Sequence, residues 1–369
     1  MTRQHRARVL GAFGALLLAL GWLATWTPVR AATEPAAAAQ SALTWLLTRQ
    51  QNDGSFAGFD AGASADAVFA LVAAGKDPNS VQKNGTSPLA YLGTQAGAYA
   101  TKSVAGAGKL ALAVVAAGGD PLNFGGQNLI GLILKGYNSG TGQYGSSTTD
   151  HAYAMLALAA TGQSIPSQAL TALDKLQLPD GGWSFDGTAA SGSDTNTTAL
   201  VAQALVAANS KGATLDKAVA YLKSQQNSDG GFPYSKASSY GSASDANSTA
   251  AVIQGLLAAG VDPRTLKQGA ADPLAALVAF QNSTGALRYQ TAAPEDNDLA
   301  TAQAIPALLL KTHPLKRASL PAQSAAAAAP AASAPSARLP GTGGSDAPLW
   351  PLAAGLALLL AGRLLLKRA

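Results

Sequence analysis

Two short segments of the chain place a carboxylic acid and an amide two residues apart. They are DTNTTA, which begins at Asp194, and DANSTA, which begins at Asp245. The amides are Asn196 and Asn247, and an amide can hydrogen-bond a ligand but has no acidic proton to give. Asp also favours the position just before a helix, so N-capping is the alternative role for Asp194 and Asp245.

A glutamine follows each of these amides after seven residues. The pairs are Asn196 with Gln203 and Asn247 with Gln254, and Asp296 stands in the same relation to Gln303. Seven residues are two helical turns, so each pair shares one face of its helix. A glutamine in an otherwise apolar, buried helix must find partners or lose about 1–3 kcal/mol. The spacing predicts a polar strip facing one interior space, where it contacts a ligand or forms a structural network with bound water.

The densest group of acids is Glu295, Asp296 and Asp298. Two carboxylates flanking a glycosidic bond would make a glycoside hydrolase, and the alternative is the capped start of a helix. The chain has no Cys, which excludes disulfides, Cys-ligated zinc and thiol nucleophiles. His151 is the one histidine well inside the central segment. A single histidine does not make a metal site, so we predict none.

The elements that must position these residues repeat along the chain. A turn of the form Gln-x3-Gly-x-aromatic recurs at Gln50, Gln177 and Gln226, with a looser copy at Gln281 and degraded copies around 95–99 and 137–144. The repeat length is about 46 residues, which is typical of helix-pair repeats.

An amphipathic stretch precedes each turn, and a stretch that is apolar nearly all round follows it. The apolar stretches are 65–74, 109–117, 152–160, 198–208, 250–259 and 299–310. An amphipathic helix keeps one face in water and an all-apolar helix is buried on every side, so six such pairs predict an outer and an inner ring. An open solenoid would need polar terminal caps. The last apolar stretch is as apolar as the others, which favours a closed ring.

Parallel inner helices would gather their N-termini at one mouth of the ring. The acids and amides expected there are Asp66, Asp150, Asp194, Asn196, Asp245, Asn247, Asp296 and Asp298. Trp183 and the other turn aromatics would lie near the same mouth. They either plug the turns or stack on a ligand.

The turn, best preserved from Gln177 to Trp183, resembles the repeats of squalene and terpene cyclases and of protein prenyltransferases. That resemblance covers about residues 36–312 and implies an α/α toroid of six inner and six outer helices. The segment DHAYAMLAL from Asp150 and the DTNTTA segment are also similar to the helical domain of the cobalamin carriers. The second resemblance implies a corrinoid-like ligand. Those carriers clamp their ligand with a further β domain, and we expect no such domain in residues 32–314.

Several activities that the first resemblance implies conflict with the residues. The zinc of the prenyltransferases and the thioester of complement-like members both need Cys. Cationic cyclases protonate their substrate with the middle acid of a D-x-D-D-T-A motif. Asn196 and Asn247 stand in place of that acid. The chain also has length for only one of the two helical domains of such cyclases.

The two ends of the chain carry targeting signals. Residues 1–31 predict a signal peptide, with Arg3, Arg6 and Arg8 before an apolar stretch. An uncleaved membrane anchor is the alternative. Residues 315–338 are an Ala/Pro/Ser-rich spacer.

Residues 339–369 resemble a cell-wall sorting signal. The recognition motif is the pentapeptide Leu339, Pro340, Gly341, Thr342 and Gly343, and an apolar stretch and basic residues follow it. This resemblance implies cleavage after Thr342 by a sortase. Arg363 interrupts the apolar stretch, and an uncut membrane anchor is the alternative. Either route leaves the protein exported and attached to the cell surface, with sortase and cell wall or membrane as partners.

The net charge of +5 comes from the two ends. Residues 32–314 carry 15 basic and 19 acidic residues, which argues against a nucleic-acid partner. We therefore expect one all-α toroid domain, 32–314, that binds a small amphiphilic, corrinoid-like ligand or a surface protein without catalysis and without a cofactor. The alternatives are an enzyme that uses lumenal carboxylates (a cyclase or a glycoside hydrolase) and a structural or adhesion module.

Overall fold

The computed structural model describes residues 34–58, 60–239, 241–269 and 271–315. All of them lie in the second of the chain's two compact units, Glu34–Ala369. The predicted signal peptide, nearly all of the predicted spacer and the predicted sorting signal lie outside the described residues.

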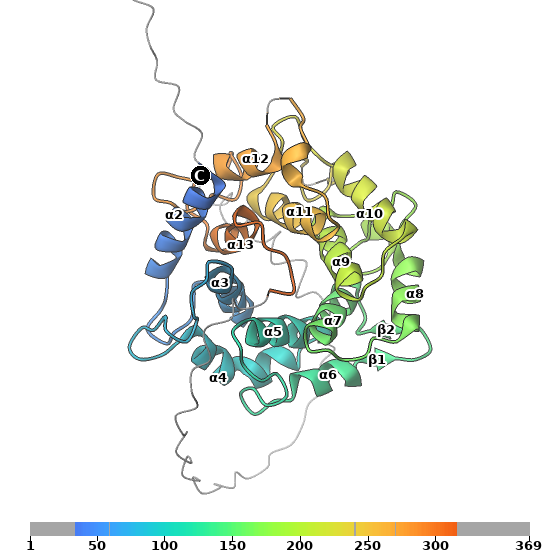
Figure 1. The fold of residues 1–369 in the computed structure, drawn as a ribbon, viewed down its shortest axis with the longest axis horizontal. Coiled ribbons are helices and arrows are strands. Elements are labelled where there is room, and N and C mark those ends of the chain that lie inside the picture. The colour runs from blue at the N-terminus through green and yellow to red at the C-terminus, as the bar shows by residue number, and fades with distance from the viewer. Residues whose placement is uncertain (1–33, 59, 240, 270, 316–369) are drawn as a thin grey trace, which may run out of the picture. The chain divides into compact units, whose positions relative to one another are not determined.

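Within the described residues, twelve α-helices alternate between an outer and an inner ring (Figure 1). The outer helices are α2 (Pro35–Thr48), α4 (Pro88–Ala100), α6 (Leu129–Lys135), α8 (Ser167–Leu176), α10 (Ala213–Ser224) and α12 (Pro273–Ala279). The inner helices are α3 (Ala61–Ala73), α5 (Val104–Ala116), α7 (Thr148–Ala160), α9 (Thr195–Ala207), α11 (Ala246–Ala258) and α13 (Asp298–Leu308). The short pieces are the hairpin β1 (Tyr137–Asn138) and β2 (Gln143–Tyr144), and the 3-10 turns η2 (Ala189–Ser191) and η3 (Pro263–Thr265). The predicted α/α toroid is confirmed.

The ring is closed. Each inner helix packs against the next, and the last one, α13, packs against both α3 and α2. Across this junction the Gln281 side chain donates to the Ala38 carbonyl at 2.8 Å, and Arg49 Nε lies 2.8 Å from Asp298 Oδ1. The apolar last helix therefore finds its cover on the first pair, as the sequence predicts.

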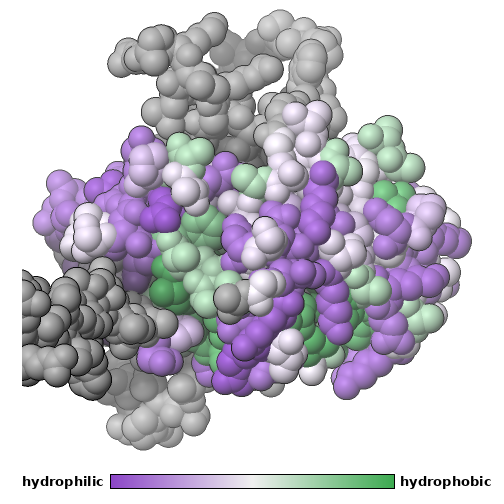
Figure 2. All heavy atoms as spheres, turned by 90° about the horizontal axis from the view of Figure 1, so that it is seen from above, coloured by the Kyte–Doolittle hydropathy of each residue, from purple (hydrophilic) through white to green (hydrophobic). Residues whose placement is uncertain are grey.

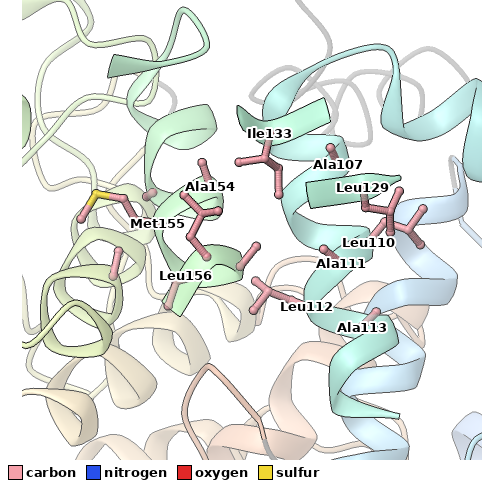
Figure 3. Close-up of a cluster of buried hydrophobic side chains, with 14 of the residues drawn as sticks. Ala107, Leu110, Ala111, Leu112, Ala113, Leu129, Ile133, Ala154, Met155 and Leu156 are labelled. Carbon is pink, nitrogen blue, oxygen red and sulfur yellow. The ribbon is translucent and has the colours of Figure 1, made fainter. Parts of the chain in front are cut away.

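Small side chains let the inner helices approach closely. An added Cβ on Gly108 of α5 would lie 2.8 Å from the backbone of Tyr153 on α7, and one on Gly255 would lie 2.8 Å from Ala199. Larger apolar residues pack in the same core (Figure 3), where Leu110 and Leu112 of α5 lie in one cluster with residues of α6 and α7. This alternation of small and large residues fills the space between the two rings.

The turns between outer and inner helices explain the Gln-x3-Gly signal. Each glutamine donates to the carbonyl of its own turn glycine and also to a carbonyl near the next outer helix. Gln177 Nε2, for example, lies 2.9 Å from both Gly181 O and Thr214 O. The turn glycine has a positive φ and lies close to that helix. At Gly181, for example, an added Cβ would lie 2.6 Å from Lys217 O, so there is no room for a side chain. Each of these four turns thus docks its pair onto the following one.

The structure departs from the predicted repeat in two places. Residues 95–99 lie inside α4, so the degraded turn predicted there does not exist, and only residues 101–103 join α4 to α5. The inner helices also begin one to five residues earlier than predicted. Their first turns contain Gly, Ser, Thr, Asp or Asn, which interrupt the apolar pattern without interrupting the helix. The copy at 137–144 is confirmed as the β1–β2 hairpin.

The outer face of the ring shown in Figure 2 carries mostly hydrophilic residues, with smaller hydrophobic areas between them. Within the described ranges, no helix is both long and apolar enough to cross a membrane. No cluster of candidate metal ligands occurs among those residues either.

Ring closure can be tested with a matched pair of glycine substitutions. Gly285 and Gly75 both have positive φ, but an added Cβ would lie 2.7 Å from Ser41 O of α2 at Gly285 and would meet nothing within 4 Å at Gly75. Gly75→Ala should lower the free energy of unfolding by about 1–2 kcal/mol through backbone strain alone. Gly285→Ala should lower it clearly further, because it also pushes the last turn away from α2. Chemical denaturation of both variants measures this, and equal losses would show that the α12–α2 junction contributes little.

Candidate functional site

The sixth residue of every inner helix faces the axis of the inner ring, and the region around this axis is here called the lumen. In each helix this residue is more exposed than its two buried neighbours; Asp66, for example, is 7% exposed between Ala65 and Ala67 at 0%. These residues are Asp66, Lys109, Tyr153, Leu200, Ala251 and Gln303, and we call them the lumenal ring.

One half of the lumenal ring is polar and connected. Lys109 Nζ lies 2.8 Å from Asp66 Oδ2, and Gln303 Nε2 donates to the same oxygen at 3.3 Å. Asn247 Nδ2 in turn donates to Gln303 Oε1 at 2.7 Å. This polar arc spans α11, α13, α3 and α5, and the lumenal-ring residues that complete the circle are Tyr153, Leu200 and Ala251. At the level of the sixth residues, the lumen therefore has a charged and amide-bearing side and a side formed by Leu200 and Ala251.

The Lys109–Asp66 ion pair fixes a positive charge in this interior. Burial alone would lower the pKa of Lys109, but the charge of Asp66 and the neighbouring hydroxyls of Tyr153 and Tyr99 raise it above its usual value. Lys109 thus stays protonated at any physiological pH. A pair this deep in the protein costs desolvation, and hydrogen bonds such as the one from Gln303 offset part of that cost.

The chain after α13 turns back into the lumen (Figure 1), and we call residues 309–315 the strap. Thr312 Oγ1 and the His313 backbone N–H both donate to Gln203 Oε1 at 2.8 Å. The His313 ring packs edge-on against Phe69 with 4.5 Å between centroids, and Leu315 is 6% exposed within the main hydrophobic cluster. Burial, helped by the charge of Lys109, lowers the pKa of His313 to about 4, so the ring is neutral.

The three predicted glutamines have different surroundings. Gln203 holds the strap, and Gln303 belongs to the polar arc. Gln254 is 7% exposed, and its Oε1 is buried without a hydrogen-bond partner. A buried acceptor without a donor costs about 1–3 kcal/mol.

Asp194 and Asp245 are the N-caps of α9 and α11. Their Oδ1 atoms accept from the backbone N–H groups of Thr197 and Ser248, each at 2.7 Å. Both residues are 1% exposed. Burial raises the pKa of Asp194 to about 6 and that of Asp245 to about 7, although these hydrogen bonds lower both values. Both residues therefore cap their helices, which is the alternative role that the sequence offered for them.

Asn196 and Asn247 occupy the second positions of α9 and α11. Asn196 is half-buried. Asn247 is 3% exposed and joins the polar arc. The structure thus brings Asn247 and Gln303 together, although they were predicted on separate pairs.

The remaining predicted residues are engaged outside the lumenal ring. Asp150 accepts from the Ala105 N–H at 2.7 Å and so links α7 to the start of α5. Asp296 precedes α13 and accepts from Asn282 and Thr284, so it does not share a helix face with Gln303. Asp298 begins α13 and pairs with Arg49.

Trp183 and His151 hold the turns. Trp183 is fully buried, and its indole N–H donates to Leu173 O at 2.9 Å, so it plugs its turn. His151 Nδ1 accepts from the Tyr144 N–H at 2.9 Å, while Nε2 donates to Ala169 O at 2.8 Å. In the corresponding contact one repeat later, Thr198 Oγ1 accepts from the Trp183 N–H at 3.0 Å. His151 is a structural residue of the same kind.

The sequence did contain a signal for the residues that were missed. Lys109 stands alone as a charge in the apolar stretch 104–116, and a charged residue inside a buried helix needs a partner. Its partner, Asp66, was assigned to a helix start because helix α3 was expected to begin at residue 65 rather than at Ala61. Leu200 and Ala251 carried no signal, since they resemble every other apolar residue of their helices.

The closed double ring and its two-sided lumen define an α/α toroid. Residues 122–285 match the sequence model of the prenyltransferase alpha-alpha toroid domain. No curated protein sequence matches the chain significantly.

Several solved structures share the fold. The type II terpene cyclase MstE from Scytonema, in its ligand-free form, has a TM-score of 0.51 and 16% identity over 74% of this chain and 97% of its own. A variant of that cyclase in complex with its product, merosterolic acid A, has a TM-score of 0.51 and 15% identity over 75% of this chain and 96% of its own. A protein from Actinoplanes has a TM-score of 0.50 and 13% identity over 75% of this chain and 98% of its own. The domain match agrees with the resemblance that the turn repeats suggested, and these structures share the toroid fold. At such identities the likeness concerns the fold alone.

The two buried caps make a prediction about pH. Folding raises the pKa of Asp194 and Asp245 above the ordinary 3.8, so the folded protein holds their protons more tightly than the unfolded chain. The stability that this contributes is full below pH 3.8 and is lost as the pH rises through about 6 and about 7. Asn caps a helix without titrating. Between pH 4 and pH 8, the unfolding free energy of the double variant Asp194→Asn/Asp245→Asn should therefore fall less than that of the wild type. For each of the two groups, the difference in slope should reach at most about 1.4 kcal/mol per pH unit.

Urea denaturation at several pH values measures this slope, with the exposed Asp216→Asn as the control. Burial lowers the pKa of His151 and His313, which opposes the effect at acid pH but is common to all variants. Identical slopes in the double variant and the wild type would show that the two caps do not titrate in this range.

Proposed function

We propose that this protein is a binding module that takes a small amphiphilic ligand into the lumen of its toroid and catalyses no reaction on it. The observation that carries the proposal is the two-sided lumenal ring. A ligand with a polar edge and an apolar body fits it, with the edge on Lys109, Asp66 and Gln303 and the body on Leu200 and Ala251. Small-molecule sites commonly combine an apolar lining with a few convergent polar groups in this way.

The carboxylates in and near the lumen are engaged by protein groups, which favours ligand binding over proton transfer to a substrate. Asp194 and Asp245 are the first residues of the two cyclase-like segments, and their carboxylates cap helices by accepting from backbone N–H groups. The positions where a cyclase acid would stand are Asn196 and Asn247. Asp66, the one carboxylate of the lumenal ring, accepts from Lys109 and Gln303. A lumen-carboxylate enzyme and a purely structural module remain the alternatives that the experiment below distinguishes.

A substitution that fills the lumen tests the proposal. Ala251→Trp should block ligand entry from the apolar side, whereas Ala237→Trp, on an exposed loop, should not. We expect at least one amphiphile of a panel that includes cobalamin to raise the melting temperature of the full-length wild type and of Ala237→Trp but not of Ala251→Trp. The two variants without ligand should melt within a few degrees of the wild type.

The outcomes separate the alternatives. Cobalamin binding, seen by its absorbance, would support the corrinoid-like version, and binding of other panel members alone would remove it. Turnover of a panel member by the wild type would favour an enzyme. Absence of any binding or turnover would overturn the proposal in favour of a structural or adhesion module.

We also propose that the toroid works outside the cell, attached through its C-terminus. The support is the order of pentapeptide, apolar stretch and basic end in residues 339–369. In a sortase-containing host, Thr342→Ala should move the protein from the cell-wall fraction to the membrane or the medium. Ser345→Ala, just beyond the pentapeptide, should leave it in the wall fraction. Equal fractionation of both variants would contradict sortase attachment.

A further inference from the structure

Gln254 is a buried polar side chain that the fold leaves unsatisfied. Its neighbours on α11 are Ile253, at 0% exposure, and Gly255, which packs against Ala199. Gln254 itself is 7% exposed, and its Oε1 has no hydrogen-bond partner. A buried acceptor is normally paired with a protein group or with water.

The position of Gln254 in its helix directs it to the lumen. It is the ninth residue of α11, as Gln203 is of α9 and Phe69 is of α3. Gln203 and Phe69 both contact the strap inside the ring. Ala251 of the lumenal ring lies three residues earlier on the same helix, about 4.5 Å nearer the N-terminal mouth.

The acceptor oxygens of the other two inner-helix glutamines are already engaged within the protein. Gln203 Oε1 takes two hydrogen bonds from the strap, and Gln303 Oε1 takes one from Asn247. The strap adds a second open position, because His313 Nδ1 is also buried without a partner. A neutral imidazole offers an acceptor at one of its two ring nitrogens.

We infer that Gln254 Oε1 is the deep anchor of the lumenal site, where it accepts a hydrogen bond from an uncharged hydroxyl or amide N–H at the leading end of an aliphatic ligand. This inference rests on the proposed function and specifies its ligand. The aliphatic body then lies on Ala251 and Leu200, on the side of the mouth.

Charge selects a neutral donor over a charged one. Lys109 and Asp66 already form an ion pair at 2.8 Å in this interior, so an ammonium group would lose its hydration without gaining an unpaired carboxylate of the lumenal ring. A carboxylate carries no proton that it can donate to an amide oxygen. An alcohol or an amide satisfies Gln254 without importing a charge.

A pair of matched probes isolates the hydrogen bond. 1-Octanol and heptyl methyl ether have the same number of heavy atoms, but only the alcohol can donate. The full-length wild type should bind the alcohol about tenfold more tightly than the ether, which is the size of one hydrogen bond to a buried acceptor. Gln254→Leu should bind both probes equally, and the exposed-loop control Gln163→Leu should keep the wild-type preference. Isothermal titration calorimetry with each protein gives the ratio.

Stability provides the second readout. Since Gln254 Oε1 has no partner in the protein, Gln254→Leu should melt no lower than the wild type, whereas a glutamine needed for the fold would lower the melting temperature. If the leucine variant does not fold, the inference that Gln254 is unpaired is wrong, and Gln254→Met then shows whether length alone restores the fold.

Each binding result decides between two statements. A wild type that binds the alcohol and the ether equally, or a Gln254→Leu that keeps the preference, would overturn the role of Gln254 and leave the lumenal site intact. If neither these probes nor the amphiphile panel binds to the wild type, the proposed function fails and the inference fails with it.

Discussion

The structure depends on the closure of the inner ring. Six all-apolar helices have no stable arrangement in water unless the last finds cover, and α13 finds it on α3 and α2. The turns support this closure, because Gln281 donates to the Ala38 carbonyl of α2 just as Gln177 donates to the Thr214 carbonyl of α10. Once the ring is closed, the residues on the inner side of every helix must share one axis.

Ring closure brings residues together that show only a weak pattern in the sequence. The sixth residues of the inner helices come from segments far apart in the chain, yet Gln303 and Asp66 are hydrogen-bonded across 237 positions. The polar residues fall on consecutive helices and so form one side of the lumen, opposite Leu200 and Ala251. The strap enters the same space and takes both free lone pairs of Gln203, so part of the polar strip supports the chain's own C-terminal segment.

Much of the fold was predictable from the sequence, and less of the site. The turns at Gln177 and Gln226 repeat one geometry, so their spacing predicts pairs of helices. The helix starts were misplaced because Ser, Thr and Asp in the first turn break the apolar pattern while they cap the helix. Asp194 and Asp245 were recognisable as caps, since cap chemistry is local. The role of Lys109 was not, because its partner lies 43 residues away on another helix.

The sequence by itself predicted six helix pairs and which helices face inward, and it favoured a closed ring over an open solenoid, because these features follow from local turn chemistry and from the cost of exposing apolar surface. Only the tertiary structure decided which polar side chains meet. Whether Gln203, Gln254 or Gln303 finds a partner depends on the rotation of each helix about its axis and on the path of the strap. Packing across the whole ring sets both, and no local run of residues encodes them.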